Sequence, residues 1–205
     1  VSFQGAALGQ AIPAMAATVT PRSAPEASLI QSAGGTTTSE TQTLRVSGTG
    51  LFALSFNGQS TAPLSAQSSA AQVRAALEGL SGIGRGNVSV SAVTGGWNVS
   101  FQGALAGRNV AQVVFSEVQV LDLRLADGQL ADVARLRLSG GANSASLSLA
   151  GTTPKQQVDM LQSTLAAASR FGSGNVAVYA TADAGVYHVV GQGTRAGTDL
   201  TTVVA

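Results

Sequence analysis

The chain has no cysteine, so a disulfide, a thiolate metal site and a cysteine nucleophile are all excluded. That absence fits a reducing compartment, and it fits equally a large secreted protein that is stabilised by repetition rather than by cross-links. Charged residues make up 10% of the chain, against about a quarter of an ordinary soluble domain. The net charge of +1 argues against nucleic acid or an anionic membrane as a partner. No apolar run approaches the ~20 residues that span a bilayer.

Aromatic residues are scarce as well, at 4%, and the residue types that carry enzyme chemistry are isolated. His188 is the only histidine; it is expected on a strand, facing solvent, with neither an orienting partner nor a nucleophile beside it. The glycines at 82, 84 and 86 follow an expected helix instead of preceding one, unlike a phosphate-binding loop. Trp97 is interpreted as a core residue. We therefore predict a protein that is not an enzyme and that binds no cofactor.

The nearest approach to a metal site is a set of three acids, Asp122, Asp127 and Asp132, spaced by five residues. Calcium needs several oxygen atoms that converge from one loop, so we interpret these acids as solvated residues around a connection and keep calcium as the alternative. Two Asn-Val-Ser triplets, at 87–89 and 98–100, match the glycosylation pattern. Both lie in expected strands, and we read them as coincidental.

Short motifs recur in the same order along the chain. The first five residues, VSFQG, recur identically at 99–103 and as VVGQG at 189–193. GNVSV at 86–90 matches GNVAV at 174–178, and LRVSG at 44–48 matches LRLSG at 136–140. Several ordered matches at a similar separation predict two full repeats preceded by the tail of a third.

Within the first repeat, the periodicity predicts strands on both sides of one helix. Alternating runs at 43–47 and 52–56 are separated by glycines, which predicts a hairpin. Ser69 followed by Gln72 is a capping box, and the apolar stripe from Val73 to Leu80 continues the helix. Further strands are expected at 88–93, 97–101 and 110–118.

The second repeat shows the same order of signals. Strands are expected at 133–138 and 145–149. Thr153 is predicted to cap a helix with Pro154 at its first position and Gln156 at its third, and Val158, Leu161 and Leu165 form the apolar stripe. Strands at 176–179, 186–190 and 200–204 complete the unit.

The expected fold class is α+β and β-rich, with tandem modules that each pack one helix on a small, mainly antiparallel sheet. Residues 1–17 are assigned to the C-terminal end of a preceding repeat, and 18–41 to a linker rich in Pro, Ser, Thr and Gly. Residues 42–127 and 128–205 are the two expected modules.

The motifs of residues 41–118 also carry a resemblance. LSFNGQSTAP at 54–63, VRAALEGL at 73–80, GNVSV at 86–90 and FQGALAG at 101–107 resemble a repeat family that recurs in tandem in large secreted or surface proteins of planctomycetes and other bacteria, and in structural proteins of some phages. The resemblance implies a structural or adhesive role and no catalytic residues. The second repeat departs from it, because it lacks the Asn-Gly turn and has Gly191 in place of the phenylalanine.

These observations favour a structural protein that builds a surface layer, filament or stalk outside the cell. The alternative is an adhesin or binding module, or a structural protein of a phage particle. Binding modules usually expose aromatic residues on loops, and this chain has few. A glycan ligand is possible but has no support in the sequence.

The beginning of the chain predicts how it associates. Its first strand carries an apolar face and lacks the hairpin and helix that should precede it, so it is expected to add to the edge of a neighbouring sheet. The strand-exchange residues are Val1, Ser2, Phe3, Gln4 and Gly5. If the chain is instead a piece of a longer polypeptide, the missing partners lie upstream. Of the two, we favour assembly by strand addition.

Overall fold

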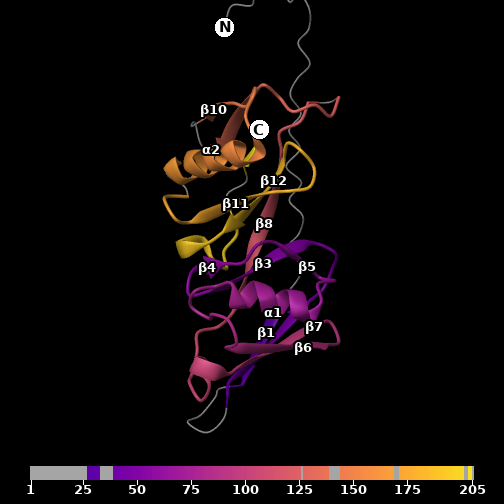
Figure 1. Ribbon diagram of the computed structural model, residues 1–205, viewed down its shortest axis with the longest axis vertical. Coiled ribbons are helices and arrows are strands. Elements are labelled where there is room, and N and C mark those ends of the chain that lie inside the picture. The colour runs from indigo at the N-terminus through magenta and orange to yellow at the C-terminus, as the bar shows by residue number, and fades with distance from the viewer. Residues whose placement is uncertain are drawn as a thin grey trace, which may run out of the picture.

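The computed structural model describes residues 27–32, 39–125, 127–138, 144–168, 171–200 and 203–204. Figure 1 shows that this part of the chain is elongated, with two helices stacked along the long axis on the same side of the strands. All strand pairs are antiparallel. The α+β, β-rich fold class is therefore confirmed.

Both helices and most of the longer strands lie close to where the periodicity predicts them. The N-terminal half contains β1 (Ala27–Ser32), β2 (Thr41–Val46), β3 (Leu51–Phe56), β4 (Gln59–Ser60), β5 (Leu64–Ser65), α1 (Ala70–Glu78), β6 (Val88–Val93), β7 (Gly96–Phe101) and the 3-10 turn η1 (Gly103–Leu105). After the long strand β8 (Val114–Asp122), the C-terminal half contains β9 (Val133–Leu138), β10 (Ser144–Ser148), α2 (Pro154–Ala167), β11 (Val176–Ala180), β12 (Val186–Gly191), η2 (Gly193–Arg195) and β13 (Val203–Val204). The strands β1, β4 and β5 and the two 3-10 turns were not expected.

The strands form three sheets. One contains β1, β2, β7 and β6 in that order, and another contains β10, β9 and β13. The third has the order β11-β12-β8-β3-β4, with β5 also paired to β3. This third sheet joins strands from both halves of the chain, and β8 lies at its centre.

Both helices begin at the predicted caps. The Ser69 hydroxyl accepts from the Gln72 backbone N–H while the Gln72 side chain accepts from the Ser69 N–H, and Thr153 and Gln156 form the same capping box. Each box satisfies backbone N–H groups that the first helical turn leaves without partners. The apolar stripes face inward, with Val73 and Leu77 of α1 and Leu161 and Leu165 of α2 buried.

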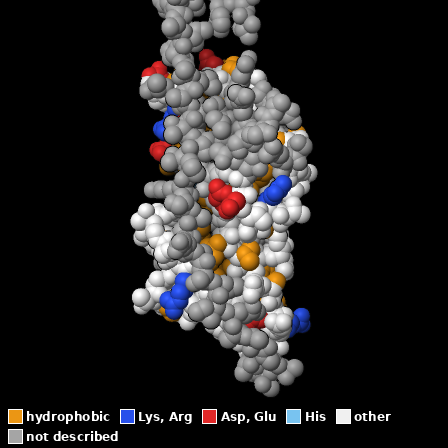
Figure 2. All heavy atoms as spheres, turned by 180° about the vertical axis from the view of Figure 1, so that it is seen from behind, with side chains coloured by type: hydrophobic (Ala, Val, Ile, Leu, Met, Phe, Trp, Pro, Cys, Tyr) orange, Lys and Arg blue, Asp and Glu red, His pale blue; other side chains and the backbone are white. Residues whose placement is uncertain are grey.

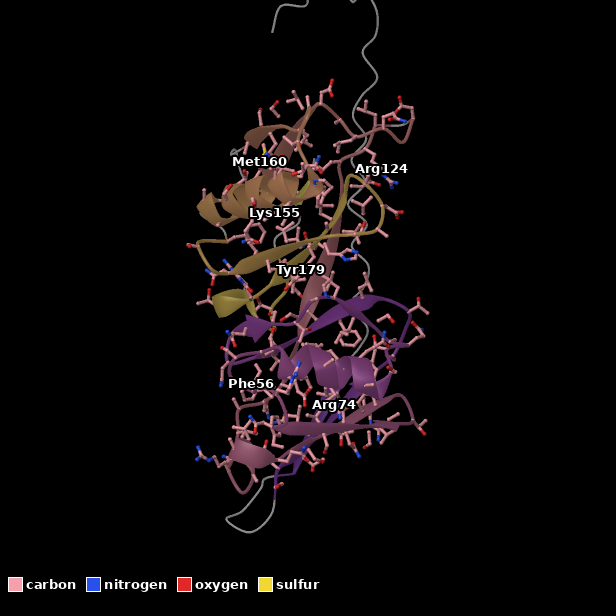
Figure 3. The ribbon with its side chains drawn as sticks, in the orientation of Figure 1. Phe56, Arg74, Arg124, Lys155, Met160 and Tyr179 are labelled. Carbon is pink, nitrogen blue, oxygen red and sulfur yellow. The ribbon has the colours of Figure 1, made fainter. Side chains whose placement is uncertain are left out.

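Each half has its own hydrophobic core. In the N-terminal half, side chains of β2, β3, β6 and β7 pack with α1, and the Phe52 ring lies 5.9 Å from Trp97 and 5.3 Å from Phe115 between centroids. Phe56 points toward the same core (Figure 3), with its ring 6.0 Å from that of Phe101. In the C-terminal half, α2 packs against side chains of β8 to β12, including Tyr187.

The predicted hairpin between 43–47 and 52–56 is wrong. β2 pairs with β1 and β7, whereas β3 pairs with β4, β5 and β8. The two strands belong to different sheets whose apolar faces meet in one core, a geometry that alternation and an intervening glycine cannot distinguish from a hairpin.

The similar sequences at 44–48 and 136–140 do not occupy equivalent positions in the fold. Leu44 lies in β2, which pairs with β7, but Leu136 lies in β9, which pairs with β10 and β13. β2 pairs with β7, and the strand that pairs with β12 in the same way is the second half of β8.

Two boundaries also differ from the prediction. Residues 27–32, which were expected in the linker, form β1, and the strand expected at 110–118 runs from 114 to 122.

Candidate assembly interface

The strand β8 connects the two halves of the molecule. Residues 114–117 pair with β3, and residues 118–122 pair with β12. On one face of this sheet Val118 packs with Ala53 of β3 and Val190 of β12, and all three are at most 3% exposed. The halves are therefore joined by a continuous hydrogen-bonded strand and by apolar contacts.

Serine hydroxyls line the junction beside this cluster. The Ser55 hydroxyl hydrogen-bonds with that of Ser60 and, at 2.6 Å, with that of Ser116. Ser60 also donates to the Gly191 carbonyl at 2.6 Å, and Ser116 accepts from the Gly197 N–H at 2.9 Å. Ser55 and Ser116 are buried, and these bonds satisfy their polar atoms.

The turn between β3 and β4 reaches the C-terminal half. Asn57 and Gly58 both have positive φ, as a tight hairpin turn requires. The Gly58 carbonyl accepts from the Gly193 N–H at 2.6 Å, and a Cβ added at Gly58 would lie 3.5 Å from the Gly193 backbone. The turn therefore contacts η2 through backbone atoms.

A glutamate and a glutamine hold the segment that leads into β8. The Glu40 carboxylate accepts from the Gln42 amide at 2.7 Å and from the Val110 N–H at 2.8 Å. Gln42 donates to the Ala111 carbonyl at 3.0 Å and accepts from the Val113 N–H at 2.8 Å. These two side chains are fully buried and fix the path of the chain out of the N-terminal half.

The same residue types recur in the C-terminal half. The Glu117 carboxylate accepts from the Leu200 N–H at 2.5 Å, and from Gln119, whose amide also donates to the Leu200 carbonyl, each at 3.2 Å. This pair was not predicted, although the sequence carries a signal for it, since SETQTL at 39–44 recurs as SEVQVL at 116–121.

Two asparagines shape the turns η1 and η2. Asn87 donates to the Ile83 carbonyl at 2.7 Å and accepts from the Ala104 N–H at 2.8 Å. Asn175 makes the equivalent bonds, to the Phe171 carbonyl at 2.7 Å and from the Thr194 N–H at 2.8 Å. The repeated GNV motif therefore has a structural role in both halves.

The three aspartates for which calcium was the alternative interpretation do not form a common site. Asp122 pairs with Arg124, whose Nε donates to Oδ1 at 2.8 Å, and this hydrogen bond lowers the pKa of Asp122. Asp127 accepts from the Gln129 N–H, and Asp132 is exposed. Among the described residues, no three His, Cys, Asp or Glu side chains are grouped as metal ligands. The strand-exchange segment, Val1 to Gly5, lies outside the described residues.

His188 was predicted to face solvent, but its side chain is only partly exposed. It is half-buried in β12, between Tyr179 of β11 and Val120 of β8, and burial lowers its pKa.

Trp97 is a core residue, 3% exposed, and its indole N–H donates to the Ser68 carbonyl. In the described part of the chain, no helix is long and apolar enough to cross a membrane. Figure 2 shows charged side chains only as isolated spots among the described atoms.

Comparison of the chain with protein-family models, with curated proteins and with solved structures finds no match.

Proposed function

We propose that this chain is a non-catalytic structural protein whose tandem modules lengthen an extracellular layer, filament or stalk. The observation that carries the proposal is the shared strand β8, which pairs with β3 in one half and with β12 in the other. A strand that pairs with the last sheet of one module and with the first sheet of the next can recur along a chain, and no single core becomes larger.

The modules meet within β8. In this proposal the first module is 39–115 and the second begins at Ser116, where the SE-x-Q motif returns. The recurring capping boxes, asparagine turns and glutamate–glutamine pairs support this division. This division differs from the boundary expected at 127–128, which lies after the end of β8.

A compensating exchange of side chains also supports the division. Phe101, the last residue of β7, lies in the first core, and the corresponding last residue of β12 is Gly191. A Cβ at Gly191 would lie 3.0 Å from the Leu200 side chain. Leu200 corresponds to Val110, since each donates its N–H to the module's glutamate. The larger leucine therefore occupies space that the missing phenylalanine leaves.

In this function the protein lies outside the cell. The resemblance of residues 41–118 to tandem repeats of bacterial surface proteins supports a site outside the cell, with a phage particle as the alternative. A low content of charge and the absence of cysteine suit a long array that gains stability by repetition.

Small-angle X-ray scattering from fusions of one, two and three copies of the full chain tests this function. We expect the maximum dimension to grow by an equal increment with each copy, because modules contact only their neighbours. Fusions that condense into compact particles would contradict it. Tight binding of a single copy to glycans or cell walls, without elongation of the fusions, would favour an adhesin instead.

A further inference from the structure

We propose that the open edge of β6 in the N-terminal half pairs with the β6 edge of a second copy, so that two chains associate side by side. The contact is formed by β6 (Val88–Val93) and by the helix α1 beside it. A layer needs a lateral contact between its arrays, and for this role the inference rests on the proposed function.

The corresponding edge of the C-terminal half, that of β11, is closed by a side chain of its helix. Asn175 accepts from the Gln192 N–H, so every second residue from Val176 onward points its N–H and C=O away from β12. Gln162 of α2 donates to the Val176 carbonyl at 2.7 Å and accepts from the Val178 N–H at 2.9 Å. One amide thus occupies a donor and an acceptor that an added strand would use.

β6 has the same place at the end of its sheet, but its edge is open. Asn87 accepts from the Gln102 N–H at 2.8 Å, so every second residue from Val88 onward points its N–H and C=O away from β7. Of these residues, Val90 is half-buried and Ala92 is exposed. Within the described part of the chain, no group forms a hydrogen bond with the outward N–H or C=O of Val90 or Ala92.

A difference between the helices explains why this edge is open. Glu78, the last residue of α1, has the position that Gln162 has in α2, nine residues after the capping residue. The Glu78 carboxylate accepts from the Gly86 N–H at 2.9 Å and lies 4.0 Å from the Arg74 side chain. A carboxylate has no donor for an outward carbonyl, so Glu78 cannot close the edge of β6 as Gln162 closes that of β11.

The helices also differ at the positions beside the two edges. Figure 1 shows α1 along β6 and α2 along β11. Residues three and seven positions before Gln162 share its face of α2, and these are Asp159 and Lys155, an exposed ion pair at 2.6 Å. The same positions of α1 are Ala75 and Ala71, both exposed. Small side chains at these positions leave room for the strand and helix of a second copy, because they let helices approach closely.

A second copy of β6 fits this edge because the strand is complementary to itself. In antiparallel pairing, Val90 of each copy lies opposite Ala92 of the other, and each such pair exchanges two backbone hydrogen bonds. The sequence from Val88 to Val93 contains no charged residue and no proline, with which edge strands commonly prevent such pairing. No like charges therefore oppose each other across the strands. Because the same patch meets itself, the contact closes as a twofold dimer.

Sedimentation velocity of the full chain from about 1 µM to about 1 mM tests the proposal with three variants. Ala92→Pro removes an outward N–H and keeps the ladder with β7, since proline is tolerated where the N–H of an edge strand faces solvent. Ala180→Pro makes the same change at the corresponding residue of β11 and is the matched control. The double variant Ala71→Lys, Ala75→Asp gives α1 the exposed ion pair of α2. Emission from buried Trp97 and far-UV circular dichroism verify that each variant is folded.

We expect the wild type and Ala180→Pro to pass from monomer to dimer as the concentration rises, without larger species. Ala92→Pro and the double variant are expected to stay monomeric. A monomeric wild type at every concentration overturns the inference, as does a dimer of Ala92→Pro as tight as that of Ala180→Pro. If the fusions of the previous section elongate while the single chain stays monomeric, the structural function stands and only this contact is refuted. If the chain forms the dimer but its fusions condense, the contact stands and the structural function is refuted.

Discussion

Polar side chains with backbone partners determine the shape of this molecule more than charged pairs do. The side chains of Glu40, Gln42, Asn87 and Asn175 all bind backbone groups of loops distant in the sequence. Surface ion pairs, such as Lys155 with Asp159, are exposed and contribute little. In a chain with few charges, buried amides and carboxylates supply the specificity.

At this scale, we expect Asn87→Ala to lower the free energy of unfolding by about 2 kcal/mol, because it leaves the Ile83 carbonyl and the Ala104 N–H without partners. Urea titration followed by Trp97 emission measures the change. Asn109→Ala, at an exposed position, is the control and should alter stability by less than about 0.5 kcal/mol. Equal effects of the two substitutions would contradict the assigned role of Asn87.

His188 gives the chain a dependence on pH. Burial lowers its pKa in the folded state, so the unfolded chain takes up a proton at a higher pH than the folded chain does. The contribution of His188 to stability is therefore complete above the unfolded pKa of about 6.5 and is lost as the pH falls through the folded pKa. We expect urea midpoints to decrease between pH 7.5 and pH 5 in the wild type, and to change less in His188→Gln. Parallel pH profiles would refute this assignment.

Among the elements, the helices are the most predictable because their signals are local. A capping box and an apolar stripe involve residues at most a few positions apart, and both helices begin where the caps indicate. Strand pairing is different. β2 and β3 are adjacent in sequence yet belong to separate sheets, because each pairs with a strand distant in the sequence, β2 with β7 and β3 with β8.

We expect Ser69→Ala and Thr153→Ala each to cost about 1 kcal/mol of stability, since each leaves a helix N-terminus without its side-chain acceptor. Ser69→Thr and Thr153→Ser keep a hydroxyl and serve as matched controls with near wild-type stability. Chemical denaturation monitored by far-UV circular dichroism distinguishes them. Alanine variants as stable as their hydroxyl controls would show that the caps contribute nothing.

For the whole molecule, the separate cores predict that the halves can be destabilised one at a time. Leu161 and Leu77 are fully buried in different cores. Leu161→Asp should unfold the C-terminal half, because an unpaired charge in a core is strongly destabilising. Emission from Trp97, the only tryptophan, reports the N-terminal half. We expect it to remain native in Leu161→Asp and to become solvent-exposed in Leu77→Asp. Loss of native emission in both variants would mean that the two cores form one indivisible unit.

The candidate interface was only partly predictable from the sequence. The motif FNG at 56–58 predicts a turn, and SE-x-Q occurs twice, but neither shows that Gly58 meets Gly193 or that Glu40 holds Val110. These contacts join residues that are distant along the chain, and one sequence has no periodicity that reports such distances.

The sequence by itself determined the two capped helices, most of the longer strands and the β-rich class, because each of these depends on neighbouring residues and on spacing of two or of about 3.6. Only the tertiary structure decided which strands share a sheet, that β8 belongs to both halves, and which motifs are equivalent. Strand partners are selected by the burial of whole apolar faces and by hydrogen bonds across the chain. Similar sequences can therefore occupy different positions in the fold, as the segments 44–48 and 136–140 do.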